Sequence, residues 1–88
     1  MTLSADALRD AAARWGTPLY VTDLDAAAVH LAEYQAVFPV ALIAYAVKAN
    51  PDPRLLARLV AAGAGCEVVT ATEVAMALRA GCPPDRLV

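Results

Sequence analysis

Hydrophobic and polar positions along the chain fall into blocks, and each block has the spacing of one kind of element. Between Ser4 and Trp15 apolar residues recur at helical spacing, and Gly16 then interrupts the pattern. Ser4 can act as the N-cap because its hydroxyl can accept a free backbone N–H. We therefore expect a first helix over residues 4–15, with a buried stripe that includes Leu8 and Trp15.

The next block changes from a strand pattern to a helix pattern. Residues 17–22 read Thr-Pro-Leu-Tyr-Val-Thr, a β-rich run with proline near its start, where no ladder donor is needed. This run predicts a short strand. A second helix is expected to follow and to extend to about Val37, with Asp23 or Asp25 as its N-cap.

The apolar run over residues 41–50 is the centre of the pattern. It contains isoleucine, valine and tyrosine and it includes the one lysine of the chain, Lys48. Such a run is typical of a strand buried on both faces, as in parallel sheets. Side chains alternate along a regular strand, so Ala46 and Lys48 should share one face and Tyr45 should face helices on the other.

A third helix is predicted directly after this run. Asp52 is a suitable N-cap, and Pro53 occupies the first helical position, where its missing N–H would have been unpaired anyway. Gly63 marks the end of the helix. The apolar residues expected to be buried by this helix are Leu55, Leu56, Leu59 and Val60.

The remaining residues predict a strand over 66–70, a helix and the start of a further strand at 86–88. Thr70 and Glu73 match a capping box for that helix. The residues expected to point inward from it are Val74, Ala75 and Leu78. Strands that alternate with helices over short connections favour a parallel sheet, either as a closed barrel or as an open doubly wound sheet.

Length and charge narrow the classes of protein. The 88 residues can form at most one small domain, and a hydrophobic content of 60% suggests a core shared with further segments. A net charge of −2 without a basic run gives no support for nucleic acid binding. The longest apolar stretch, residues 37–47, is about half as long as a membrane helix, so we expect no membrane span.

The cysteines and the amino terminus bear on the compartment. Cys66 and Cys82 lack metal-ligand spacing, and we interpret them as small buried residues in a reducing compartment, with no metal site. Asp6 lies where a signal peptide needs a basic and then an apolar region. The cytoplasm is therefore the expected location.

Lys48 is the candidate for chemistry. An amine at the mouth of an apolar layer is partly desolvated, which disfavours the ammonium form and makes the neutral nucleophile available for attack on a carbonyl. That is the chemistry of a Schiff base. The alternative for an isolated lysine at a strand end is a stem that packs on apolar surface while the ammonium reaches water.

The sequence around Lys48 resembles the cofactor-lysine motif of the fold-type III pyridoxal-phosphate enzymes. These are alanine racemase-like barrels that include the diaminopimelate, ornithine and arginine decarboxylases. The motif is Tyr45-Ala46-Val47-Lys48-Ala49-Asn50, and further similar blocks are residues 16–23, 63–70 with Glu73, and 80–88. The likeness is greatest to the amino-terminal part of a diaminopimelate-decarboxylase-type enzyme.

The resemblance implies an α/β fold: the opening β/α units of an alanine racemase-like (β/α)8 TIM barrel, truncated, because such a barrel needs about 250 residues. Residues 1–24 would form a helix and an edge strand that join a carboxy-terminal β-domain absent from this chain. Residues 25–88 would form part of the barrel domain that binds pyridoxal phosphate.

The same resemblance assigns roles to three residues. Lys48 would form the internal aldimine with pyridoxal 5'-phosphate, and Ala46 would leave room beside the cofactor ring. Glu67 stands where the family usually has aspartate, near the lysine and the cofactor. It could hold the ammonium or assist proton transfer, or it could simply be a solvated strand-end carboxylate.

The implied function is that of a pyridoxal-phosphate-dependent amino-acid decarboxylase, a carboxy-lyase that takes an amino acid as its small-molecule substrate and forms a homodimer when complete. We expect residues 1–88 alone to be inactive and weakly folded. Whether the substrate is diaminopimelate, ornithine, arginine or a related amino acid stays open. Two alternatives also stay open: an alanine racemase-type enzyme, and a non-catalytic decarboxylase homologue that acts as a binding or regulatory partner.

Overall fold

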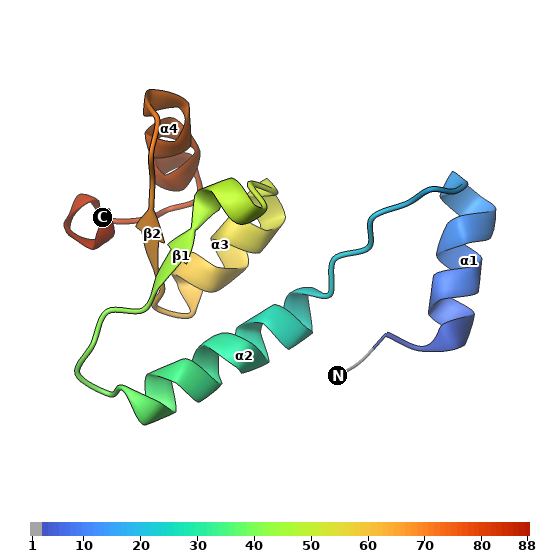
Figure 1. Cartoon of the computed structure of the whole chain (residues 1–88), viewed down its shortest axis with the longest axis horizontal. Helices are drawn as coiled ribbons and strands as arrows, with labels where there is room; N and C mark the ends of the chain where they lie inside the picture. Colours follow the sequence, from blue (N-terminus) through green and yellow to red (C-terminus); the bar gives the residue numbers. More distant parts are fainter. Residues whose placement is uncertain (1–2) are drawn as a thin grey trace.

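The computed structural model describes residues 3–88 as a chain of alternating helices and short strands (Figure 1). Short 3-10 turns at Val47–Ala49 and Pro84–Arg86 follow the first strand and the last helix. In chain order, the helices and strands are α1 Ala5–Trp15, α2 Leu24–Val37, β1 Ala44–Ala46, α3 Pro53–Ala61, β2 Gly65–Glu67 and α4 Ala71–Arg79.

The two strands form a parallel sheet, as predicted. Ala44 lies opposite Gly65, and Ala46 lies opposite Glu67. Both strands are shorter than expected, since each has only three residues. The predicted further strand begins at the end of the chain, where Leu87 forms a parallel bridge with Cys66 and the Val88 N–H donates to the Cys66 carbonyl at 2.9 Å. The observed order is thus that of successive β/α units.

Helix α3 forms the centre of the core, and its predicted buried residues are confirmed. Its N-cap is Asp52, and Pro53 is its first residue. Leu56 and Val60 pack with Val47 and Cys66 in one cluster that also contains Ala77 and Cys82. The second cluster contains Leu31, Leu55, Leu59 and Ala64. Through these two clusters, α3 contacts α2, the sheet and α4. Each fully buried leucine or valine stabilises the fold by about 1.5–3 kcal/mol.

The predicted inward face of α4 is wrong in part. Ala77 is the one buried residue within this helix, whereas Leu78 is 46% exposed. Val74 is half-buried as expected, but Ala75 is exposed. The small Ala77 side chain lets the helix approach the core closely, and it lies three positions after Val74, on the same helical face. The larger Leu78 therefore faces outward.

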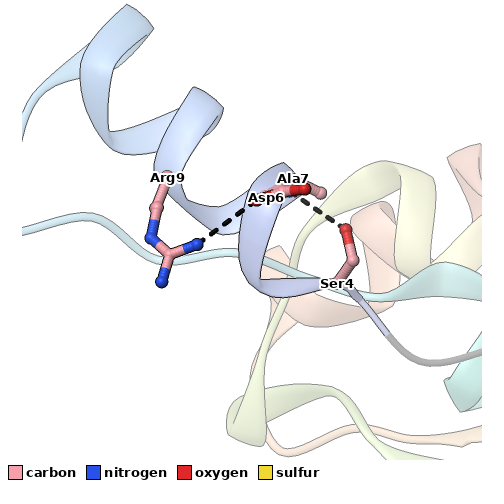
Figure 2. Close-up of polar contacts among 4 residues, drawn as sticks. All are labelled: Ser4, Asp6, Ala7 and Arg9. Atoms are coloured by element: carbon pink, nitrogen blue, oxygen red, sulfur yellow. Dashed lines mark hydrogen bonds and ion pairs between the residues drawn. The ribbon is translucent and has the colours of Figure 1, made fainter.

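Helix α1 begins as predicted, but its expected buried stripe is absent in the described chain. The Ser4 hydroxyl accepts the Ala7 N–H at 3.0 Å, and Arg9 pairs with Asp6 at 3.2 Å (Figure 2). No residue of α1 is buried, and the Trp15 side chain is 66% exposed. Figure 1 shows the reason: α1 lies apart from the other elements at the end of an extended segment.

That extended segment, residues 16–23, does not form the predicted strand. None of its residues pairs with β1 or β2, and Tyr20 is fully exposed. A strand needs a ladder partner for its backbone groups, and residues 3–88 provide none here. The radius of gyration is accordingly 14.6 Å, whereas a compact domain of this length has about 12 Å. The division of the chain into residues 1–24 and 25–88 stays a prediction.

Candidate functional site

Lys48 lies immediately beyond β1, in the 3-10 turn Val47–Ala49. The expectation that Lys48 belongs to a regular strand is therefore wrong, because the strand ends at Ala46, and alternation along a strand no longer determines on which face Lys48 lies. Val47 is completely buried and pins the turn to the core, whereas Lys48 is exposed. The lysine thus projects from a turn whose preceding residue is fixed.

Ala46 and Glu67 are the last residues of the two strands and lie opposite each other in the parallel register. Residues opposite each other in a parallel pair lie on the same face of the sheet. Both residues are partly buried. The structure therefore brings Lys48, Ala46 and Glu67 to the same edge of the sheet, at the carboxyl ends of its strands. Within residues 3–88, neither Lys48 nor Glu67 forms an ion pair.

The opposite face of the sheet packs on the helices, as predicted for Tyr45. Tyr45 lies opposite Cys66 in the register and contacts both core clusters. Cys66 is only 1% exposed, and burial together with the neighbouring Cys82 thiol raises the pKa of its thiol to about 11. A thiol with this pKa stays protonated at neutral pH, so it is a structural group.

The loop after Lys48 is held by hydrogen bonds that the sequence analysis did not assign. The Asn50 side-chain carbonyl accepts the Asp52 N–H at 3.1 Å, and the Asp52 carboxylate accepts the Arg54 N–H at 2.8 Å. The bond from the Arg54 N–H lowers the pKa of the Asp52 carboxyl. The Asn-Pro-Asp-Pro sequence is the signal for such a turn, because asparagine and aspartate side chains readily accept nearby backbone N–H groups.

Glu73 and Thr70 form a cap at the start of α4. The Thr70 hydroxyl accepts the Glu73 N–H at 3.1 Å, and the Glu73 carboxylate accepts the Val69 N–H at 3.0 Å. The predicted capping box has the Thr70 N–H as the second donor, so the observed cap differs by one residue. Glu73 is thereby used in the cap.

The residues at the sheet edge fit the attachment of an aldehyde cofactor. Lys48 is exposed and unpaired among the described residues, so its amine is accessible, and Ala46 is small enough to leave room beside it.

In residues 3–88, no group of three or more histidine, cysteine, aspartate or glutamate side chains could hold a metal ion. None of the helices in this range is long and apolar enough to cross a membrane.

Comparison with known sequences identifies the family. Residues 24–88 match the sequence model of the pyridoxal-dependent decarboxylases, described as their pyridoxal binding domain. The chain belongs to the pyridoxal-dependent decarboxylase family. The predicted family and its cofactor, pyridoxal 5'-phosphate, are thereby confirmed.

Individual pyridoxal-dependent decarboxylases align over most of the chain. The diaminopimelate decarboxylase of Deinococcus radiodurans is 46% identical over 88 residues, which cover 100% of this chain and 23% of the relative. The ornithine decarboxylase of Schizosaccharomyces pombe is 38% identical over 69 residues, covering 78% of this chain and 16% of the relative. Among solved structures, that of AQ1208 from Aquifex aeolicus superposes with a TM-score of 0.87 and 42% identity, over 91% of this chain and 20% of that one. The chain thus spans about a fifth of the length of these relatives.

Proposed function

We propose that this chain is the amino-terminal part of a pyridoxal-phosphate-dependent amino-acid decarboxylase, in which Lys48 holds the cofactor covalently. The observation that carries the proposal is the position of the one lysine of the chain. It projects from the turn directly after β1, at the edge where the strand ends Ala46 and Glu67 lie opposite each other. Carboxyl ends of parallel strands are where β/α barrels place their reactive groups.

Each residue at this edge would have a distinct role. When bound, pyridoxal phosphate supplies the electron sink that makes loss of carbon dioxide from an amino acid possible. Lys48 would bind the cofactor through Nζ, which requires the neutral amine. The Glu67 carboxylate could accept the proton that Nζ releases, because it lies on the same edge of the sheet. Ala46 would leave the cofactor ring free to lie against β1.

Other parts of the proposal concern the longer protein. Residues 25–88 would be the opening β/α units of a (β/α)8 barrel, and residues 1–24 would pair with a separate β-domain. We infer a homodimer in the cytoplasm, and no activity for residues 1–88 alone. Diaminopimelate is the first substrate to test, because the diaminopimelate decarboxylase of D. radiodurans is more similar to the chain than the ornithine decarboxylase of S. pombe is.

The test is to trap the cofactor on the protein. The longest polypeptide that the reading frame of residues 1–88 encodes is incubated with pyridoxal phosphate. It is then reduced with borohydride, digested and analysed by mass spectrometry. A pyridoxyl group on Lys48 is expected, and Lys48→Gln should abolish it while leaving the fold intact, because this side chain is exposed. A folded protein without an adduct on Lys48 would refute the proposal and leave a non-catalytic homologue.

Turnover is measured on the same preparation. Carbon dioxide release from diaminopimelate is compared with release from ornithine and arginine at equal concentration. Release from diaminopimelate alone would support the proposed substrate, and preference for ornithine or arginine would replace it without affecting the role of Lys48. The isolated 88-residue chain serves as the control and is expected to release none.

A further inference from the structure

A hydrogen bond spans the turn that carries Lys48. The Tyr45 hydroxyl donates to the Asn50 backbone carbonyl at 3.0 Å, so the bond joins the middle of β1 to the residue just beyond the turn. The Tyr45 ring is half-buried between the two core clusters and is therefore a fixed support. Burial also raises the pKa of the Tyr45 phenol, so the hydroxyl keeps its proton and stays a donor at neutral pH.

The turn is held on both sides of Lys48. On the amino-terminal side, the Val47 side chain is completely buried. On the carboxy-terminal side, Asn50 accepts the Tyr45 hydroxyl through its backbone and the Asp52 N–H through its side chain. The Lys48 side chain forms no hydrogen bond or ion pair within residues 3–88. The backbone of the turn therefore sets the point and the initial direction from which this side chain leaves the fold.

We propose that Tyr45 is a positioning residue for Lys48: its hydroxyl fixes the turn and thereby directs the lysine amine toward the sheet edge formed by Ala46 and Glu67. The inference rests on the proposed function of Lys48. Without the hydroxyl, the turn keeps the Val47 anchor but loses its tie to β1, and the amine samples more directions. Attachment of the cofactor then costs more conformational entropy.

Tyr45→Phe tests this role because it removes the hydroxyl and keeps the buried ring. Tyr34→Phe is the matched control, since Tyr34 is 59% exposed and its hydroxyl has no partner among the described residues. The longest polypeptide containing residues 1–88 is used in each case. One readout needs no cofactor: hydrogen exchange of the Asp52 amide, with the Leu56 amide in α3 as the measure of general stability.

Two readouts follow attachment of pyridoxal phosphate itself. The first is the cofactor concentration that gives half-maximal borohydride-trapped adduct on Lys48. The second is the visible circular dichroism of the attached cofactor, measured before reduction and divided by the amount of adduct on Lys48, which reports how uniformly the cofactor is oriented in the folded protein. Loss of one hydrogen bond of ordinary strength predicts an increase of about fivefold in the half-maximal concentration for Tyr45→Phe.

The outcomes separate the inference from the function on which it rests. Faster Asp52 exchange, a higher half-maximal concentration and weaker circular dichroism in Tyr45→Phe, with Tyr34→Phe unchanged, would support the positioning role. If the half-maximal concentration and the circular dichroism of the Lys48 adduct are the same in the wild-type protein and in both variants, the positioning role of Tyr45 is overturned and the proposed function of Lys48 stands. Equal acceleration of Asp52 and Leu56 exchange with unchanged circular dichroism would reduce Tyr45 to a stabilising residue. No adduct in any protein would overturn the proposed function as well.

Discussion

Raising the pH above 9 should destabilise the fold through Cys66. Burial and the neighbouring Cys82 thiol raise the pKa of the Cys66 thiol from its ordinary value of 9.0 to about 11. The unfolded chain therefore loses this proton near pH 9, whereas the folded chain keeps it until about pH 11. Because the folded state binds the proton more tightly, its stabilising contribution is complete below pH 9 and is lost as the pH rises to 11.

The size of the effect follows from the shift. One pKa unit corresponds to about 1.4 kcal/mol, so the full loss between these pH values is roughly 3 kcal/mol. Ordinary domains of this size have a free energy of unfolding of about 4–13 kcal/mol, and the weakly folded chain expected here should lie at or below the lower end of that range, so the loss is a large share of its stability. The chain should therefore approach its unfolding transition in alkaline solution without denaturant or heat.

Urea denaturation of the wild-type chain and of Cys66→Ala, followed by far-UV circular dichroism at several pH values, measures this contribution. The variant is expected to be less stable at pH 7, because it loses buried sulfur contacts, but its stability should fall less steeply above pH 9. Tyr45 also has a raised pKa through burial, but it is present in both proteins and cancels in the difference. A difference in unfolding free energy that stays constant from pH 8 to pH 11 would refute the reasoning.

Two substitutions test local contacts by thermal and urea denaturation. Gly65→Ala should cost about 1–3 kcal/mol, because a Cβ atom there would lie 2.6 Å from the Arg86 backbone oxygen and the end of the turn Pro84–Arg86 would have to shift; unchanged stability would contradict this steric account. Thr70→Ala should cost about 1 kcal/mol through loss of the bond to the Glu73 N–H at the start of α4. Thr72→Ala, at an exposed position of the same helix, is its control, and equal losses in the two variants would exclude a specific capping effect.

Elements specified by neighbouring residues were predictable from the sequence. Helix α3 is the clearest case, because Asp52, Pro53 and a stripe of apolar residues at helical spacing together define its start and its buried face. The caps at Ser4 and Thr70 were likewise predictable, and Asp23, which caps α2, was one of the two residues expected there, since each cap depends on one side chain and a backbone N–H three residues later. Such signals involve contacts within a few residues and need no knowledge of the rest of the fold.

The course of the chain around Lys48 was not predictable by the same means. A continuous apolar run indicates burial, but it does not say where a strand ends. Here β1 ends at Ala46 because the next residue, Val47, turns into the core formed by α3 and α4, and Lys48 leaves the sheet with the turn. The orientation of α4 also depends on this core, because Ala77 is the residue of α4 that packs into it, whereas the larger Leu78 faces outward.

Exposed apolar surface connects the fold with the family assignment. The chain has 6059 Å² of accessible surface, whereas a compact monomer of its mass has about 4,900 Å². Tyr20 and Val40 are fully exposed, and Trp15 and Val37 are about two-thirds exposed. Helical periodicity in α1 predicted a buried stripe, but in the described chain Leu8 and Trp15 are exposed, because periodicity does not show whether a partner surface is present. Part of the surplus comes from the extended course of residues 16–23 and the separate position of α1, and the exposed Val37 and Val40 are compatible with the proposal that residues 25–88 share a core with further segments.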